Sequence, residues 1–117
     1  MLTDLNIFAI AGAKARHAAA RQAVIAQNVA NADTPGYRAR DLEPFEKTLS
    51  RMERDYGSHA PRIVEVTGLG AGSPNGNTVS IEDEMMRAGA AVRDHEIAST
   101  IYAKALSMMR SALGGRR

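Results

Sequence analysis

The most regular feature of the chain is the apolar pattern of its C-terminal third. Apolar or small side chains recur there in alternating steps of four and three residues, a helical spacing. This row consists of Ile81, Met85, Ala88, Val92, His95, Ser99, Tyr102, Leu106, Met109 and Leu113. A second row lies beside it and consists of Ile97, Ile101, Ala105, Met108 and Ala112. We predict a helix over residues 80–113 whose apolar face is wide enough for more than one partner helix.

Both ends of this helix are marked in the sequence. Ser80 is followed three residues later by Asp83, a short-armed capping box. Acidic residues fill the first turn and Arg110 lies near the end, as the helix dipole favours. Gly114 is expected to end the helix.

A second long helix is predicted over residues 4–32, with Thr3 or Asp4 as its cap. Its apolar seam consists of Phe8, Ala11, Ala15, Ala18, Gln22, Ile25, Val29 and Ala32. Alternating steps of three and four are typical of a helix that packs lengthwise on another helix. At 1.5 Å per residue it would be roughly 40 Å long.

The middle of the chain, residues 33–79, has a different character. Leu42, Phe45, Leu49, Met52 and Tyr56 predict a short helix, with Pro44 in its first turn. Residues 57–77 are rich in Gly, Pro and Ser and are expected to be loop, apart from a brief strand within residues 62–67.

Residues 1–117 are therefore predicted to form one all-α domain. Its long terminal helices would pair as an antiparallel helical hairpin or coiled coil, with a short helix and an irregular Gly/Pro-rich middle segment.

Composition adds that the core must be small. Much of the 44% hydrophobic content is alanine and only 4% of residues are aromatic, so helix formation is favoured more than burial. A chain of this length also buries a modest fraction of its surface. We expect the fold to complete its core against neighbouring subunits.

Enzyme chemistry is not indicated. His17, His59 and His95 lie in separate segments without a metal-ligand spacing, and cysteine is absent. The glycines of residues 68–76 lack the Gly-Lys-Ser/Thr ending of a phosphate loop. No catalytic residue, metal site or cofactor is predicted, and no secretory signal or membrane span is expected.

The segment "NVANADTPGYRARD", residues 28–41, carries the most specific signal. Pro35 and Gly36 suit the two central positions of a type II turn, and Gly36 would supply the positive φ. Asn31 and Thr34 can hydrogen-bond backbone groups around the helix end. A helix stop explains the proline and glycine, but not the whole string.

The string resembles the N-terminal signature of the bacterial flagellar axial proteins, the rod, hook and hook-associated family. The positions that match are Asn28, Asn31, Thr34, Pro35, Gly36 and Tyr37. A second segment, "GNTVSIEDEM" at residues 76–85, resembles the entry into the C-terminal helix of the proximal rod members. Ser80 stands where an aspartate is expected, a change that keeps the capping role.

This resemblance implies a structural subunit of the proximal rod, located in the periplasmic part of the flagellar basal body. It implies self-association through the terminal helices around the export channel, and export by the flagellar type III system without a cleaved signal. The implied partners are other rod proteins, the rod–ring junction protein FliE, the MS ring and the export gate. We expect the monomer to be marginally ordered and to gain stability on assembly.

Six side chains are predicted to make the helix-packing contacts of this assembly: Ile25, Val29, Ile101, Tyr102, Leu106 and Met109. The six motif residues would lock the end of the N-terminal helix to neighbours.

A different class of function remains open at this point, a small basic helical protein that binds nucleic acid. The net charge of +2 is small and the arginines do not gather on one helix face. A secreted helical effector or an export chaperone is a third possibility.

Overall fold

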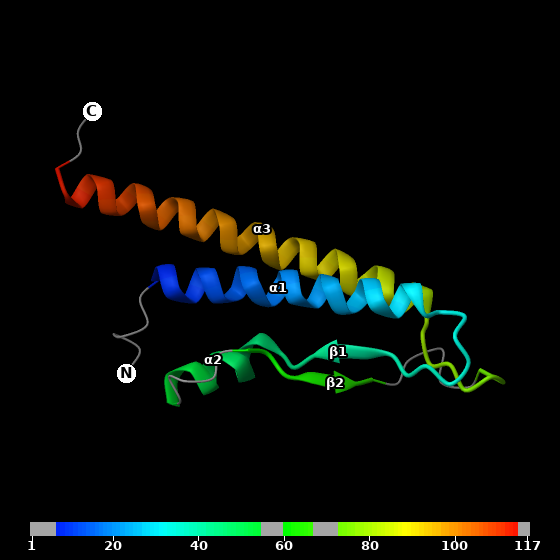
Figure 1. Cartoon of the computed structure of the whole chain (residues 1–117). Helices are drawn as coiled ribbons and strands as arrows, with labels where there is room; N and C mark the ends of the chain where they lie inside the picture. Colours follow the sequence, from blue (N-terminus) through cyan, green and yellow to red (C-terminus); the bar gives the residue numbers. More distant parts are fainter. Residues whose placement is uncertain (1–6, 55–59, 67–72, 115–117) are drawn as a thin grey trace.

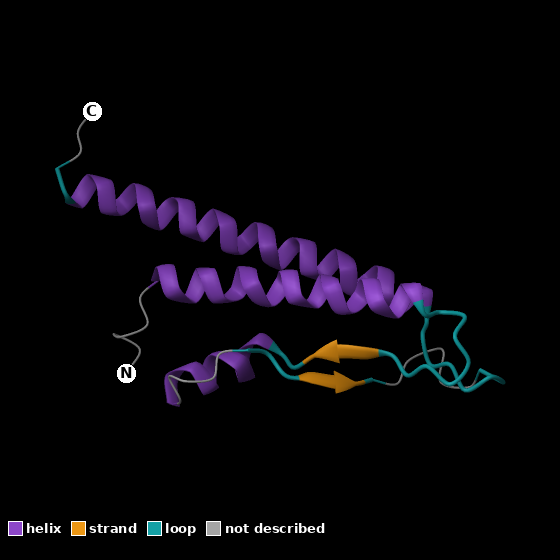
Figure 2. Ribbon diagram, in the orientation of Figure 1, coloured by secondary structure: helices purple, strands orange, loops and turns teal. Residues whose placement is uncertain are grey.

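A computed structural model of the chain describes residues 7–54, 60–66 and 73–114. The described elements are α1 (Ile7–Ala30), β1 (Arg40–Leu42), α2 (Phe45–Arg54), β2 (Ile63–Glu65) and α3 (Ile81–Ala112). Figure 2 shows that helix dominates, with one small two-stranded sheet. The predicted cap at Thr3 or Asp4, and most of the glycine-rich stretch after Val66, lie outside the described residues.

Helix α1 is the central layer of the fold. In Figure 1, α3 runs along one side of α1, and the sheet and α2 lie along the other. The two long helices are antiparallel, as predicted. Phe8 stacks edge-on against Tyr102 near one end of the pair, and Asn28 bonds Glu84 near the other.

The contact between α1 and α3 is made largely by small side chains. The buried residues of α3 are Glu84, Ala91, Ala98 and Ala105, spaced seven apart. On α1, Ala11, Ala18 and Ile25 are buried at the same spacing. A seven-residue repeat of buried positions is the pattern of a coiled coil. Because alanine is short, the two backbones can approach closely.

Apart from Tyr102, which packs on Phe8, most large apolar residues of α3 are exposed and do not form this contact. Met85 is 69% exposed, Val92 45% and Leu113 80%. The predicted apolar row therefore lies mostly outside the helix pair, and the alanines seven residues apart form the contact in its place. Size explains the difference, because a close helix crossing accommodates alanine and excludes methionine or leucine.

The sheet corrects the all-α prediction. β2 falls within the segment 62–67, where a brief strand was expected, and it pairs antiparallel with β1. Sequence patterning missed β1 because its three residues, Arg40, Asp41 and Leu42, are too few to show alternation. The short helix α2 is confirmed, and it begins directly after Pro44.

The predicted ends of α3 are also confirmed. The Ser80 hydroxyl accepts a hydrogen bond from the Asp83 backbone N–H at 3.3 Å. After the helix, Gly114 has a φ of 84° and its N–H donates to the Ser111 carbonyl. Helix α1 ends at Ala30, two residues before the predicted end.

Glu43 fixes the α2 layer to the rest of the fold. Its carboxylate accepts hydrogen bonds from the Thr48 hydroxyl at 2.7 Å, from Arg51 at 2.8 Å and from the Arg62 backbone N–H at 3.2 Å. Its backbone carbonyl lies 2.8 Å from Nε2 of the buried His17 on α1. Burial alone would raise the pKa of the Glu43 carboxyl, but these hydrogen bonds and the charge of Arg51 outweigh it and hold the pKa below 4.5.

This lowered pKa predicts an acid-sensitive contribution to stability. The ionised carboxylate stabilises the folded chain above about pH 4.5, and that contribution is lost as the pH falls through the lower pKa of the folded state. Glu43→Gln should lower the free energy of unfolding at pH 7 by about 3 kcal/mol, because Arg51 then loses its buried counter-charge.

Urea unfolding followed by circular dichroism at pH 7 and at about pH 3 tests this prediction. The wild-type chain should lose more stability than Glu43→Gln between the two conditions. Equal losses would show that Glu43 is not the group responsible.

Candidate functional site

The two segments that carry the family resemblance meet in space. The turn after α1, residues 31–37, lies against residues 75–78, which lead into α3 (Figure 1). The N–H of Gly36 donates to the Asn75 carbonyl at 2.9 Å, and the N–H of Thr78 donates to the Tyr37 carbonyl at 3.0 Å. We call this region, residues 28–41 with residues 75–87 and Arg21, the corner.

Asn28 lies at the centre of the corner, with its side chain fully buried. Its Nδ2 donates to the Arg40 carbonyl at 2.7 Å and to the Glu84 carboxylate at 3.0 Å. Its Oδ1 accepts from the Arg40 N–H at 3.1 Å and from the Tyr37 hydroxyl at 3.0 Å. Both donors and both acceptor sites of the amide are therefore used. One side chain joins α1, β1, the turn and α3.

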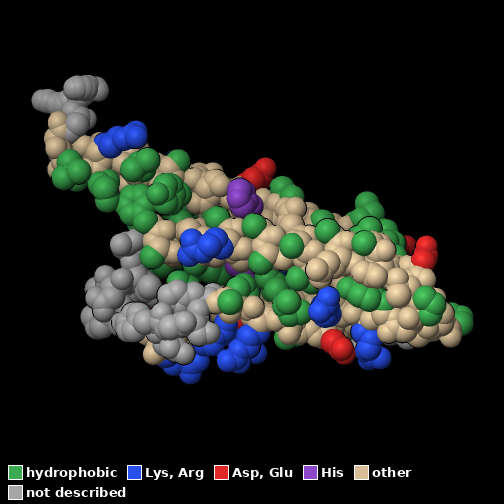
Figure 3. All heavy atoms as spheres, in the orientation of Figure 1, with side chains coloured by type: hydrophobic (Ala, Val, Ile, Leu, Met, Phe, Trp, Pro, Cys, Tyr) green, Lys and Arg blue, Asp and Glu red, His purple; other side chains and the backbone are tan. Residues whose placement is uncertain are grey.

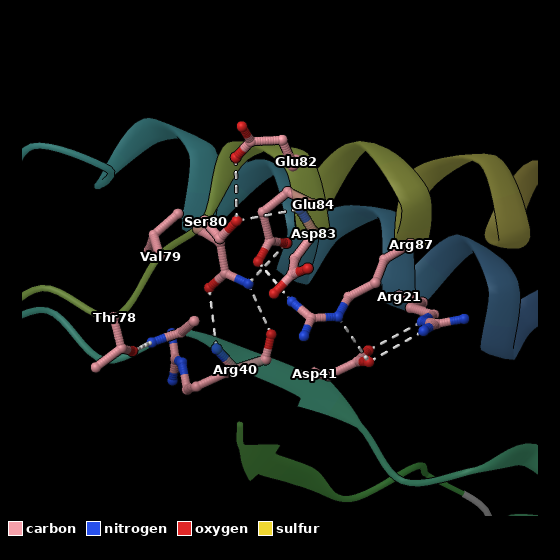
Figure 4. Close-up of polar contacts among 12 residues, drawn as sticks. Arg21, Arg40, Asp41, Thr78, Val79, Ser80, Glu82, Asp83, Glu84 and Arg87 are labelled. Atoms are coloured by element: carbon pink, nitrogen blue, oxygen red, sulfur yellow. Dashed lines mark hydrogen bonds and ion pairs between the residues drawn. The ribbon is translucent and has the colours of Figure 1, made fainter. Parts of the chain in front are cut away.

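A network of charged side chains extends from Glu84. The second oxygen of this buried carboxylate accepts from Arg87 at 2.7 Å. Arg87 also lies 3.6 Å from Asp41 of β1, and Asp41 receives both arms of Arg21 from α1, at 2.9 and 3.0 Å. Figure 4 shows Asp41 between the two arginines. Two arginines and two carboxylates thus link three elements with no net charge.

The turn itself has the geometry expected from its sequence. The Tyr37 N–H donates to the Thr34 carbonyl at 3.2 Å, and Gly36 has a φ of 76°. A β-carbon at Gly36 would meet no atom within 4 Å, so the glycine is required by the backbone angle and not by crowding. Asn31 closes the helix end, donating to the Gln27 carbonyl at 2.8 Å and accepting from the Thr34 hydroxyl at 3.1 Å.

Asn77 and Thr78 hold the second segment on the turn. Buried Asn77 donates to the carbonyls of Asn31 at 2.8 Å and Thr34 at 2.6 Å. The Thr78 hydroxyl accepts from the Ala39 N–H at 2.7 Å. Sequence reasoning singled out this segment only as a match and assigned no contact to it. It also missed Glu84, although Glu84 shares the seven-residue spacing of Ala91, Ala98 and Ala105.

The six predicted helix-packing residues do not form one cluster in the single chain. Ile25 is buried, Ile101 and Leu106 are half-buried, and Val29, Tyr102 and Met109 are 45–46% exposed. Tyr102 packs edge-on against Phe8, with 5.1 Å between the ring centres.

The polar contacts of the corner hold the surrounding elements together. The buried side chains of Asn28, Asp41, Asn77 and Glu84 are all engaged in hydrogen bonds or ion pairs within the corner. Over residues 7–54, 60–66 and 73–114, no group of His, Asp and Glu side chains is arranged to hold a metal ion. Neither long helix of the described part is apolar enough to cross a membrane.

Comparison with known proteins shows which family the chain resembles. The sequence profile described as "Flagella basal body rod protein" matches residues 12–38, most of α1 and the turn. The flagellar basal body rod protein FlgB of Agrobacterium fabrum is 26% identical over 124 residues, which cover 92% of each chain. FlgB of Salmonella typhimurium is 27% identical over 83% of this chain and 85% of its own. These matches support membership of the flagellar basal body rod proteins.

The relatives named above are FlgB proteins, which supports a rod protein of the FlgB type. FlgB of Escherichia coli is 47% identical over 49 residues, a stretch that covers 42% of this chain and 34% of its relative. The family consists of structural rod subunits of the flagellar basal body and is not an enzyme family. Association with other rod components follows from membership, and no comparison supports a nucleic-acid-binding protein.

The hydrogen bonds of the corner predict unequal roles for its two signature asparagines. Asn28→Ala leaves the Arg40 backbone groups and the Glu84 carboxylate buried with fewer partners, so the free energy of unfolding should fall by about 3 kcal/mol. Asn31→Ala removes bonds near the surface and should cost about 1 kcal/mol or less.

Urea titrations of both variants, followed by circular dichroism at 222 nm, measure the difference. Asn31→Ala is the matched control, because it makes the same truncation three residues away. Equal losses in the two variants would contradict the central position given to Asn28.

Proposed function

We propose that this rod subunit polymerises through α1 and α3 around the flagellar export channel, in the proximal part of the rod. There it would link the MS ring and the export gate to the rest of the rod, with FliE, the rod–ring junction protein, as a neighbour. Family membership supplies the structural role, and the observation that carries the proposal is the exposed apolar surface of α3.

This surface is large for a chain of this size. Ten of its residues are large hydrophobic side chains that are at least 45% exposed, and they are Ile81, Met85, Met86, Val92, Ile97, Tyr102, Met108, Met109 and Leu113 of α3 and its end, with Ile7 of α1. Figure 3 shows hydrophobic side chains gathered on the outer part of α3. Monomeric proteins seldom leave so extended an apolar surface in water. Neighbouring helices in an assembly would cover it.

Small and large apolar residues differ in the contacts they make, and this difference supports the same proposal. Alanines satisfy the contact between α1 and α3 within one chain. Large residues therefore stay available for contacts between chains, including Val29, Tyr102 and Met109 of the predicted set. Ile101 and Leu106 are half-buried and would complete their burial there, while Ile25 is already buried in the chain.

The six motif residues are proposed to act indirectly, by setting the angle between α1 and α3. The turn of Thr34, Pro35, Gly36 and Tyr37 holds the end of α1 at a fixed angle to the start of α3, through the hydrogen bonds of Asn28 and Asn31. A fixed angle keeps the apolar surfaces of successive subunits in register. The exposed parts of the turn would meet an adjacent subunit.

Delivery by the flagellar type III system, without a cleaved signal, is part of the proposal. A chain with little aromatic burial needs little free energy to unfold. It could pass a narrow channel unfolded and gain its remaining stability when neighbours cover α3.

Met109→Glu tests assembly without disturbing the fold. Met109 is 45% exposed, so a charge there should change the free energy of unfolding by about 0.5 kcal/mol or less. It should nevertheless reduce incorporation into basal bodies about tenfold, because a buried unpaired carboxylate is costly at an apolar interface. The measurement is the amount of the protein in purified basal bodies, with swimming motility as a second readout.

Ser107→Glu is the matched control, since Ser107 is an exposed polar residue two positions away on α3. It should be incorporated normally. Wild-type amounts of Met109→Glu in basal bodies would refute the role of this surface, as would equal exclusion of both variants.

A further inference from the structure

Helix α2 separates its charges onto two faces. Lys47 lies three residues before Ser50 and four before Arg51, and Arg54 lies four and three residues after them, so the four share a face. Glu46 and Glu53, seven residues apart, share another. Arg62, just before β2, adds a further cation to the basic face. Together with Glu43 these basic-face residues line an open cleft of about 580 Å³.

Among the residues that the structure describes, three of the four cations that line this cleft have no carboxylate paired with them. Among the described lining residues the one acidic side chain is Glu43, and it is paired with Arg51 at 2.7 Å in a site where both side chains are about nine-tenths buried. Within residues 7–54, 60–66 and 73–114, the side chains of Lys47, Arg54 and Arg62 have no acidic partner. Nε of Arg51 is buried without a hydrogen-bond acceptor among the described residues.

The position of the cleft makes it accessible in an assembly. It lies on α2, and α1 separates α2 from α3 (Figure 1). Figure 3 shows the basic side chains grouped along the edge of the molecule away from α3. A ligand can therefore occupy the cleft while the apolar surface of α3 is covered by neighbouring helices.

We propose that this cleft binds an acidic segment of a partner protein through several carboxylates. Lys47 and Arg54 are seven residues apart, about 10 Å along the helix axis, a separation that suits two carboxylates better than one. A peptide segment with spaced acidic side chains matches this separation. The identification of the partner as another basal-body protein rests on the proposed function. The binding chemistry of the cleft does not rest on it.

Carboxylates fit the cleft better than the phosphates of a nucleic acid. The ionised Glu43 in its floor, with Glu46 and Glu53 on the flanks of α2, repels a dense polyanion. The net charge of the whole chain is also only +2. Nucleic-acid binding proteins usually present a larger continuous basic surface.

The test is a fluorescence anisotropy titration with a labelled hexaglutamate peptide at low ionic strength. Lys47→Glu/Arg54→Glu should weaken binding about tenfold or more, because charge reversal in a complementary interface replaces attraction by repulsion. Arg51 is left unchanged, since it holds Glu43. Arg93→Glu/Lys104→Glu makes the same charge change at exposed positions of α3 and should bind within about twofold of wild type.

Equal binding by the cleft variant and wild type would overturn the proposal, and so would equal weakening by the α3 variant. A labelled single-stranded hexanucleotide serves as the competing probe. If it binds the cleft and hexaglutamate does not, the carboxylate assignment is wrong. Loss of basal-body incorporation by Met109→Glu bears on the proposed function alone, so the two proposals can fail separately.

Discussion

The structure depends on one buried amide. Asn28 occupies the last full turn of α1 and uses all four of its hydrogen-bonding positions, on the Arg40 backbone, on Tyr37 and on Glu84. An apolar residue there would leave these buried groups unsatisfied, at a cost of about 1–3 kcal/mol each. The hydrogen bonds of Asn28 therefore decide where the chain leaves α1 and where α3 begins.

This constraint explains why two distant motifs belong together. The turn with Gly36 reverses the chain after α1, and Asn77 and Thr78 hold the returning segment on that turn. The charges of Glu84, Arg87, Asp41 and Arg21 extend the same junction along α1 and β1. A small protein with few aromatic residues thereby gains a fixed angle between its helices from polar contacts instead of from a large core.

The packing of the long helices complements the corner. Ala91 and Ala98 are almost fully buried between α1 and α3, while large apolar residues of α3 point away from the pair. The close helix contact and the exposed apolar surface are thus two consequences of the same sequence. The first defines the subunit, and the second is the surface through which we propose that it binds its neighbours.

Much of this fold was predictable, because periodicity and capping are local properties. Both long helices, α2, the Ser80 cap and the positive φ of Gly36 follow from short-range patterns. The sequence did not predict which face of α3 packs on α1. Periodicity shows that a helix face is apolar, but it does not show which partner covers that face. β1 is too short to show a pattern. The partners of Asn28 and Asn77 depend on contacts between segments about 50 residues apart, which a single sequence does not display.

Amide hydrogen exchange of the dilute monomer, followed residue by residue by NMR, tests the central claim most directly. The Arg40 amide, bonded to Asn28, and the Thr78 amide, bonded to Tyr37, should exchange far more slowly than the amides in the last turns of α3, where Met108 and Leu113 are exposed. That order would show that the corner forms in the single chain and that the outer part of α3 awaits its neighbours. If the Arg40 and Thr78 amides exchange as fast as those of the α3 end, the corner does not organise the fold and the account is wrong.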